Sequence, residues 1–172
     1  AGALAREIDD RRALSLTTSY IALIMARRGD YERAIAGYER SLRIAWEIGD
    51  RWTACLNVAG LAAVNEWIGR VDEAEMLYRR AIEFGLNLCI PGFVAGMLVN
   101  LARFLLAQGR ADEARSIYQD ALSQISSVAG ERLAGEDTRF DAQVLGIRLR
   151  HALGELTGVE AEADLRALLL QA

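Results

Sequence analysis

The residue types that most often carry chemistry are sparse in this sequence. His151 is the only histidine, so a metal site built from several histidines is impossible and a histidine-based triad has a single candidate. Cys55 and Cys89 have a spacing that matches no metal or redox motif, and no nucleotide-binding glycine loop or zinc-protease motif occurs. We therefore predict that the protein is not an enzyme, and we expect no catalytic residue, metal or cofactor.

The same residues have structural explanations. Cys55 and Cys89 are expected to be small buried hydrophobic residues without a disulfide, in a reducing compartment. His151 lies in the stretch RLRHALGEL, where we expect a structural role. Gly92 and Gly96 have the spacing of a membrane helix-dimer motif, but in a charged chain they more plausibly permit close helix packing.

Composition narrows the function classes further. The chain has 172 residues, of which 52% are hydrophobic and 26% charged, so it can form one domain or one repeat array with a core. The net charge of −4 and the absence of a basic run argue against nucleic acid as a partner. No apolar run reaches the roughly 18 residues of a membrane span, and the start resembles no signal peptide. We expect a cytoplasmic protein with no membrane partner.

The elements that position these residues follow from an internal repeat. The segment GRVDEAEMLYRRAI begins at Gly69, and GRADEARSIYQDAL begins 40 residues later at Gly109. Four columns align in three successive units. They comprise Gly29, Gly69 and Gly109; Ala34, Ala74 and Ala114; Tyr38, Tyr78 and Tyr118; and Leu42, Ile82 and Leu122.

Each unit has apolar residues at helical spacing on both sides of a turn that contains glycine. In the second unit this pattern predicts helices at about 52–68 and 71–88. Gly69 suits the left-handed conformation that ends a helix, and Asp72 favours the next helix start. Ala74 allows the helices to approach closely, and Tyr78 fills the groove between them. Because one hairpin cannot bury its own apolar faces, successive hairpins are expected to stack.

The repeats are predicted to span 11–50, 51–90 and 91–130 of one array that covers residues 1–172. Residues 5–13, AREIDDRRA, match 45–53, AWEIGDRWT, so residues 1–9 are interpreted as the tail of a preceding repeat. After Ser127 the register breaks, and Gly158 is the next turn glycine that we expect. Residues 136–172 are predicted to form an atypical or capping hairpin, with helices at about 137–156 and 159–170.

These columns resemble the tetratricopeptide repeat, in a 40-residue form in place of the usual 34 residues. The longer form is similar to the repeats of kinesin light chains, Pins-type adaptors and bacterial STAND-type ATPase regulators of the MalT and AfsR kind. The resemblance covers residues 5–128. It implies an all-α, right-handed superhelical solenoid of antiparallel helix hairpins, in which the first helix of each hairpin lines a concave groove.

Fixed steps back from each turn glycine select the groove face of these first helices. The candidate partner-binding residues on that face are Ser19, Tyr20, Leu23, Arg27, Ala63, Glu66, Trp67, Asn100, Arg103 and Leu106. The resemblance implies that Asn100 hydrogen-bonds the backbone of an extended peptide; a cap or loop hydrogen bond is the alternative. For Trp67 we expect either a contact with a partner or packing on the next hairpin. Trp46 and Trp52 are expected in the core between repeats.

Three functions follow from this interpretation. The first is a protein–protein interaction scaffold that binds a peptide or helix of a partner in the concave groove. The second is the effector-sensing or autoregulatory arm of a larger bacterial regulator, in contact with other domains of its own parent chain. The third is self-association through exposed terminal hairpins.

Overall fold

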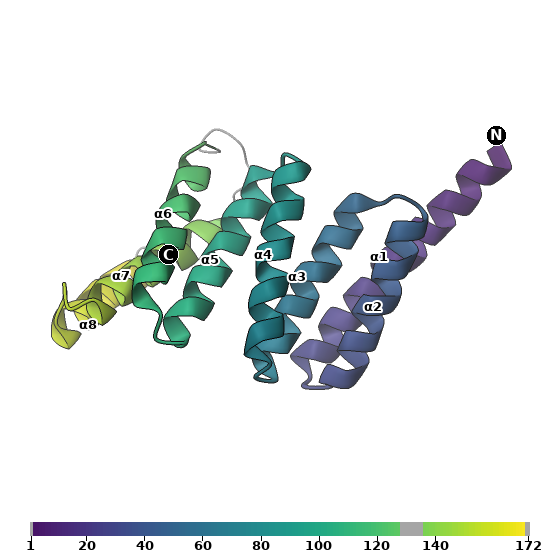
Figure 1. Ribbon diagram of the computed structural model, residues 1–172. Coiled ribbons are helices and arrows are strands. Elements are labelled where there is room, and N and C mark those ends of the chain that lie inside the picture. Colours follow the sequence, from purple (N-terminus) through teal and green to yellow (C-terminus); the bar gives the residue numbers. More distant parts are fainter. Residues whose placement is uncertain (1, 128–135, 171–172) are drawn as a thin grey trace. The chain divides into compact units, whose positions relative to one another are not determined.

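The computed structural model describes residues 2–127 and 136–170, and every regular element within these ranges is a helix. The helices pack in sequence as antiparallel hairpins, so the predicted all-α helical-repeat fold is confirmed (Figure 1). The chain divides into two compact units at residues 84 and 85, a point that falls inside one of the helices. Residues 128–135, with which the predicted break in register begins, and the last two residues lie outside the described residues.

Unit 1 contains α1 (Gly2–Arg27), α2 (Tyr31–Glu47), α3 (Arg51–Trp67) and most of α4 (Val71–Asn87). The bounds of α3 and α4 lie within one residue of the prediction. Residues 2–9 are continuous with the rest of α1, with no turn at Asp9, the residue that aligns with Gly49. The assignment of residues 1–9 to a preceding repeat stays a prediction.

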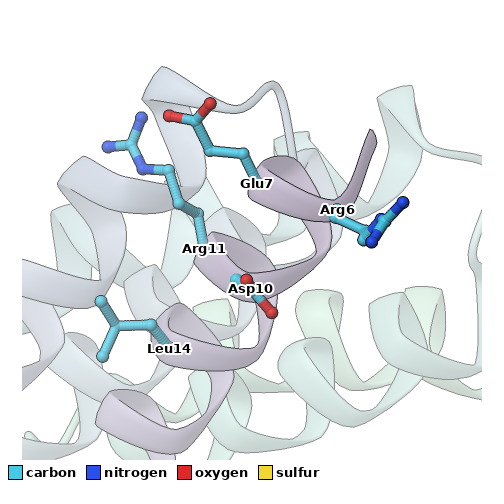
Figure 2. Close-up of a pocket in the computed structure, with 5 residues that line it drawn as sticks. All are labelled: Arg6, Glu7, Asp10, Arg11 and Leu14. Atoms are coloured by element: carbon cyan, nitrogen blue, oxygen red, sulfur yellow. The ribbon is translucent and has the colours of Figure 1, made fainter. Parts of the chain in front are cut away.

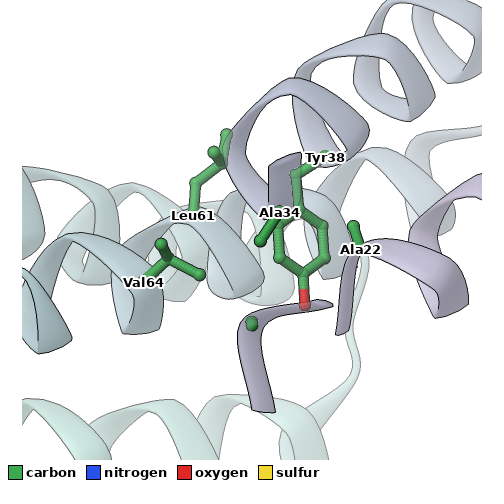
Figure 3. Close-up of a cluster of buried hydrophobic side chains, with 6 residues drawn as sticks. Ala22, Ala34, Tyr38, Leu61 and Val64 are labelled. Carbon is green, nitrogen blue, oxygen red and sulfur yellow. The ribbon is translucent and has the colours of Figure 1, made fainter. Parts of the chain in front are cut away.

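The core of unit 1 combines small side chains with one tyrosine. Small side chains let three helices approach the ring of Tyr38, namely Ala22 and Ala26 of α1 and Ala34 of α2. Leu61 and Val64 of α3 complete the cluster (Figure 3). All six residues are at most 7% exposed. The alanine and tyrosine columns of the sequence are therefore the columns that pack this core.

Buried polar groups also tie these helices together. Ser15 and Ser41 exchange hydrogen bonds between each other's hydroxyls and backbone carbonyls, at 2.9 and 2.7 Å. The Asn57 amide donates to the Ser41 hydroxyl at 2.8 Å. A buried polar group without such a partner would destabilise the fold, so this network fixes which faces of α1, α2 and α3 meet.

Unit 2 contains the end of α4, then α5 (Pro91–Ala107), α6 (Ala111–Ser127), α7 (Glu136–Ala152) and α8 (Gly158–Leu169). The expected turn role of Gly158 is wrong. Gly154 has the positive φ, 73°, and closes the end of α7, whereas Gly158 is the first residue of α8. Thr157 caps α8 in a reciprocal pair with Glu160, which fixes the helix start there.

Left-handed turns end most of the helices. Gly29, Gly49, Gly69, Gly109 and Gly154 all have φ between 73° and 82°. For the column of Gly29, Gly69 and Gly109, this is the conformation that the sequence predicts. Cys89 occupies the same kind of turn between α4 and α5 with φ of 53°, although it carries a Cβ. The expectation that Cys89 is buried is wrong, because this turn is exposed.

Replacing Cys89 with glycine is expected to stabilise the protein. The left-handed conformation costs a residue with a Cβ about 1 kcal/mol or more, and glycine avoids this cost. The Cys89→Gly variant should therefore melt roughly 2–4 °C higher in a thermal unfolding experiment. Gly49→Ala, at the aligned position between α2 and α3, is the control and should lower the melting temperature. A lower melting temperature for Cys89→Gly would contradict the assigned backbone conformation.

Asp50 holds the start of α3. Its carboxylate accepts hydrogen bonds from the Thr53 backbone at 3.1 Å and from the Thr53 hydroxyl at 2.9 Å, and Arg12 of α1 donates to it at 3.0 Å. Burial raises the pKa of Asp50, but the bonds from Thr53 and the Arg12 charge outweigh this effect and lower the pKa below its usual value. The ionised carboxylate thus stabilises the folded state.

Stability should therefore fall in acid partly through Asp50. Because the pKa is lower in the folded state, the stabilisation is fully present above the unfolded value near pH 4 and is lost as the pH falls through the folded value. Asp50→Asn keeps a helix cap but removes the charge, and should cost about 1 kcal/mol at pH 7. Urea unfolding at pH 7 and pH 3 measures this cost, which should shrink at pH 3. An undiminished difference at pH 3 would rule out the charge as its origin.

Candidate partner-binding face

The candidate residues of unit 1 all lie on the surface of two first helices. Ser19, Tyr20, Leu23 and Arg27 belong to α1, and Ala63, Glu66 and Trp67 belong to α3. Each is exposed or half-buried, whereas the intervening Ala22 and Ala62 are buried. Since α1 and α3 contact each other, the seven residues come from neighbouring helices of this unit.

The helical periodicity that selects this face also selects two residues at its edge that are buried. Ala26 and Val99, which fall on the same spacing, are only 2% and 4% exposed. Ala26 belongs to the core cluster that surrounds Tyr38. Residues at the edge of a helical face can turn into the core, and these two do so.

Trp67 is the most prominent aromatic residue of the face. Its side chain is 48% exposed, and its ring lies 6.2 Å from the ring of Tyr31, centroid to centroid, at 47°. Tyr31 opens α2 of the preceding hairpin, so this ring contact of Trp67 runs back along the chain. The sequence analysis did not single out Tyr31; the one signal was an aromatic residue where the other units have Val71 and Ala111.

The other two tryptophans are not in the core, contrary to expectation. Trp46 is 47% exposed and Trp52 is 41% exposed. Their neighbours Ala45 and Thr53 occupy the core positions, so the tryptophans are rotated one residue away from the core. Trp46 nevertheless connects successive hairpins, because its ring meets Phe84 of α4 edge-on at 5.7 Å.

The tyrosine column brings hydroxyl groups to the first helices. The Tyr78 hydroxyl donates to Glu66 of α3 at 2.6 Å. Burial raises the pKa of Tyr38, and the nearby positive charge of Arg27 lowers it in part. Tyr78 thus packs the core with its ring and holds Glu66 of the candidate face with its hydroxyl, a second role that the sequence analysis did not foresee.

The candidate residues of unit 2 lie on α5. Asn100, Arg103 and Leu106 follow one another at intervals of three and are all half-buried. The Asn100 side chain makes no hydrogen bond with other parts of the chain that the structure describes, so the expected cap or loop bond is not observed within them. Asn100 and Arg103 together offer an amide and a guanidinium about one helical turn apart.

A shallow polar pocket in unit 2 was not predicted. It is lined by α6, α7 and α8, where Tyr118 faces Gly146. Arg150 pairs with Asp164 at 3.2 Å, and burial raises the pKa of Tyr118 while Arg150 partly offsets this effect. These charges already bind each other, so the pocket is a weaker candidate than the first-helix face.

The residues that could carry chemistry belong to different units, with Cys55 in α3 of unit 1 and His151 in α7 of unit 2. Cys55 is buried and donates to the Ala81 carbonyl at 3.7 Å, and burial raises the pKa of its thiol to about 11. His151 is exposed, with its ring lying 3.1 Å from the Leu156 carbonyl. Among the described residues, no group of three or more acidic, cysteine or histidine side chains could hold a metal ion. None of the helices in these ranges has the length and apolar character needed to span a membrane.

Comparison with known proteins agrees with the repeat geometry. Residues 94–123, which cover most of the α5 and α6 hairpin, match the tetratricopeptide repeat family. The crystal structure of BtubC (BKLC) from P. vanneervenii has a similar fold, with a TM-score of 0.63 and 19% sequence identity over 97% of this chain and 80% of that chain. Among curated protein sequences, none matches this chain significantly.

The family match identifies a tetratricopeptide repeat at residues 94–123, and the stacked hairpins and the solved structure support a helical-repeat fold of this type. Repeats of this type generally mediate interactions between proteins and are not themselves catalysts.

Proposed function

We propose that this protein is an interaction module whose first helices α1, α3 and α5 bind a segment of a partner protein. The observation that carries the proposal is the aromatic pair of Trp67 and Tyr31, which stays half-exposed on the face that the resemblance predicts for binding. Large aromatic side chains exposed beside small residues are typical anchors of protein interfaces. Ala63, one turn before Trp67, leaves space for an incoming side chain.

The chemistry of the face indicates the kind of segment that fits. An apolar side chain of the partner would pack on the Trp67 ring, where burial of its surface drives binding. On α5, the Asn100 amide can both donate to and accept from a peptide backbone. A partner segment with an apolar anchor is therefore the best match for unit 1, and an extended backbone is the best match for unit 2.

A capture experiment with matched variants tests the proposal. The domain is immobilised and exposed to lysate of its source organism, and retained proteins are identified by mass spectrometry. Trp67→Ala tests unit 1, and Asn100→Ala with Arg103→Glu tests unit 2. Met76→Ala is a control that removes another exposed apolar side chain, from α4. We expect a protein that wild type and control retain and both test variants lose. Equal retention by all variants would contradict binding on the first helices.

A further inference from the structure

An apolar stripe runs along the exposed side of α1, apart from the candidate partner-binding residues. Leu14, Ile21 and Ile24 are 46%, 50% and 50% exposed. Thr17 lies between them, and the exposed charges of Asp10 and Arg28 flank them. The spacing of the complete set alternates between four and three residues, which is the pattern of a helix that packs along another helix. The α1 stripe consists of Asp10, Leu14, Thr17, Ile21, Ile24 and Arg28.

The residues that align with the α1 stripe in the next repeat are buried. Ala54, Leu61 and Val64 of α3 align with the three apolar residues of the α1 stripe and are 0%, 7% and 1% exposed. Leu61 and Val64 are buried against α2, where they meet Ala34 and Tyr38. The exposed stripe of α1 therefore has the shape and chemistry that this chain buries beneath a helix.

A helix of the α2 type does not fit α1 in the same way. Gly60 of α3 leaves the space for the Tyr38 ring, since a Cβ there would lie 2.5 Å from ring atoms. The residue in that column of α1 is Tyr20, which is 61% exposed. A tyrosine from an α2-like helix would collide with Tyr20, so the α1 stripe requires a different partner helix.

The α1 stripe is complementary to itself when two copies run antiparallel. In one register, Leu14 faces Ile24 of the second copy, and Thr17 faces Ile21 of the second copy. The same register places Asp10 opposite Arg28 of the second copy, so each end of the contact joins opposite charges. Every pair then occurs twice, as a two-fold symmetric interface requires.

We propose that a second copy of this chain docks on the α1 stripe, with the two α1 helices antiparallel and the Asp10 and Arg28 pairs closing both ends. Figure 2 shows Asp10 and Leu14 at one end of the stripe, where with Arg6, Glu7 and Arg11 they line an open pocket. Arg11 is paired with Glu47 of α2, and Asp10 is the exposed carboxylate that has the spacing of the stripe. Tyr20 lies at the edge of the contact, near the two-fold axis.

Sedimentation equilibrium over a wide range of protein concentration tests this dimer. The wild type should shift from the mass of one chain to the mass of two as the concentration rises. Ile21→Glu should raise the dissociation constant at least about a hundredfold, because each dimer loses two buried isoleucines and gains two buried charges. Met76→Glu, at a residue of α4 that is 58% exposed, should leave the dissociation constant unchanged. A single-chain mass at every concentration, or a dimer that survives Ile21→Glu, would overturn the proposal.

Charge exchange tests the register without touching the apolar residues. Asp10→Arg alone places two arginines together at each end, and Arg28→Asp alone places two aspartates together, so each should weaken the dimer severalfold. The double variant Asp10→Arg with Arg28→Asp restores opposite charges and should recover the wild-type dissociation constant. A double variant no stronger than the single ones would exclude the antiparallel pairing. Neither variant alters Trp67, Asn100 or Arg103, so this result is independent of partner capture.

Discussion

Gly60→Ala is expected to destabilise the protein by about 1–3 kcal/mol, although alanine is the better helix former. A Cβ at Gly60 would lie 2.5 Å from two atoms of the Tyr38 ring, and that ring is 4% exposed within the core of unit 1. The ring cannot move away without opening the contact between α1, α2 and α3. Urea unfolding followed by circular dichroism measures the change.

Gly96→Ala is the matched control for this prediction. Gly96 is also in the interior of a first helix, α5, but among the described residues the nearest atom to a Cβ there is the Thr138 hydroxyl at 3.8 Å. The same substitution should therefore stabilise the protein by up to about 1 kcal/mol through helix propensity. Tyr38→Leu shortens the obstructing side chain, so its effect should combine with that of Gly60→Ala less than additively. Equal effects of the two glycine substitutions would refute the close packing at Gly60.

Trp67→Ala should weaken binding of a partner segment by about 2 kcal/mol, or roughly 30-fold in the dissociation constant. The indole is a large aromatic side chain of the candidate face that is 48% exposed, and the Tyr31 ring lies beside it. Isothermal titration calorimetry with a peptide from a captured partner measures the loss. Trp67→Phe keeps an aromatic ring and should retain most of the affinity.

A double-mutant cycle with Tyr31 makes the prediction more specific. If Tyr31 acts by holding the Trp67 ring, Tyr31→Ala should weaken binding in the wild type and have little further effect in Trp67→Ala. Thermal unfolding of each variant separates a loss of binding from a loss of folding. Unchanged affinity in Trp67→Ala would remove the aromatic pair from the binding face.

The backbone of this protein was the more predictable part. The glycine, alanine and tyrosine columns determine the turns and the closest helix contacts, and local residue types are sufficient to place α3 and α4 within a residue. The turn after α7 was predicted at Gly158 and lies at Gly154, because either glycine could end a helix in a pattern that specifies only a glycine near the turn. The cap formed by Thr157 and Glu160 fixes the start of α8 and so decides between the two glycines. Extending the register of the earlier repeats takes no account of this cap.

Side-chain contacts across helices were less predictable. Periodicity identifies a helical face but not its edge, since Ala26 and Val99 share the spacing of the candidate face although they are in the core. The pairing of Trp67 with Tyr31 and of Tyr78 with Glu66 depends on how neighbouring helices are aligned, which no single helix encodes. The same holds for the buried bonds of Ser15, Ser41 and Asn57.

The contrasting environments of the two cysteines make the unmodified protein ready for site-specific labelling. Thiol reagents react with the thiolate, and Cys55 is buried with its pKa raised to about 11, so it is protected at neutral pH. Cys89 is exposed in its turn. A maleimide fluorophore should therefore attach at Cys89 alone, next to the start of the helix that carries Asn100 and Arg103. Its emission can then report the arrival of a partner on α5 without any engineered cysteine.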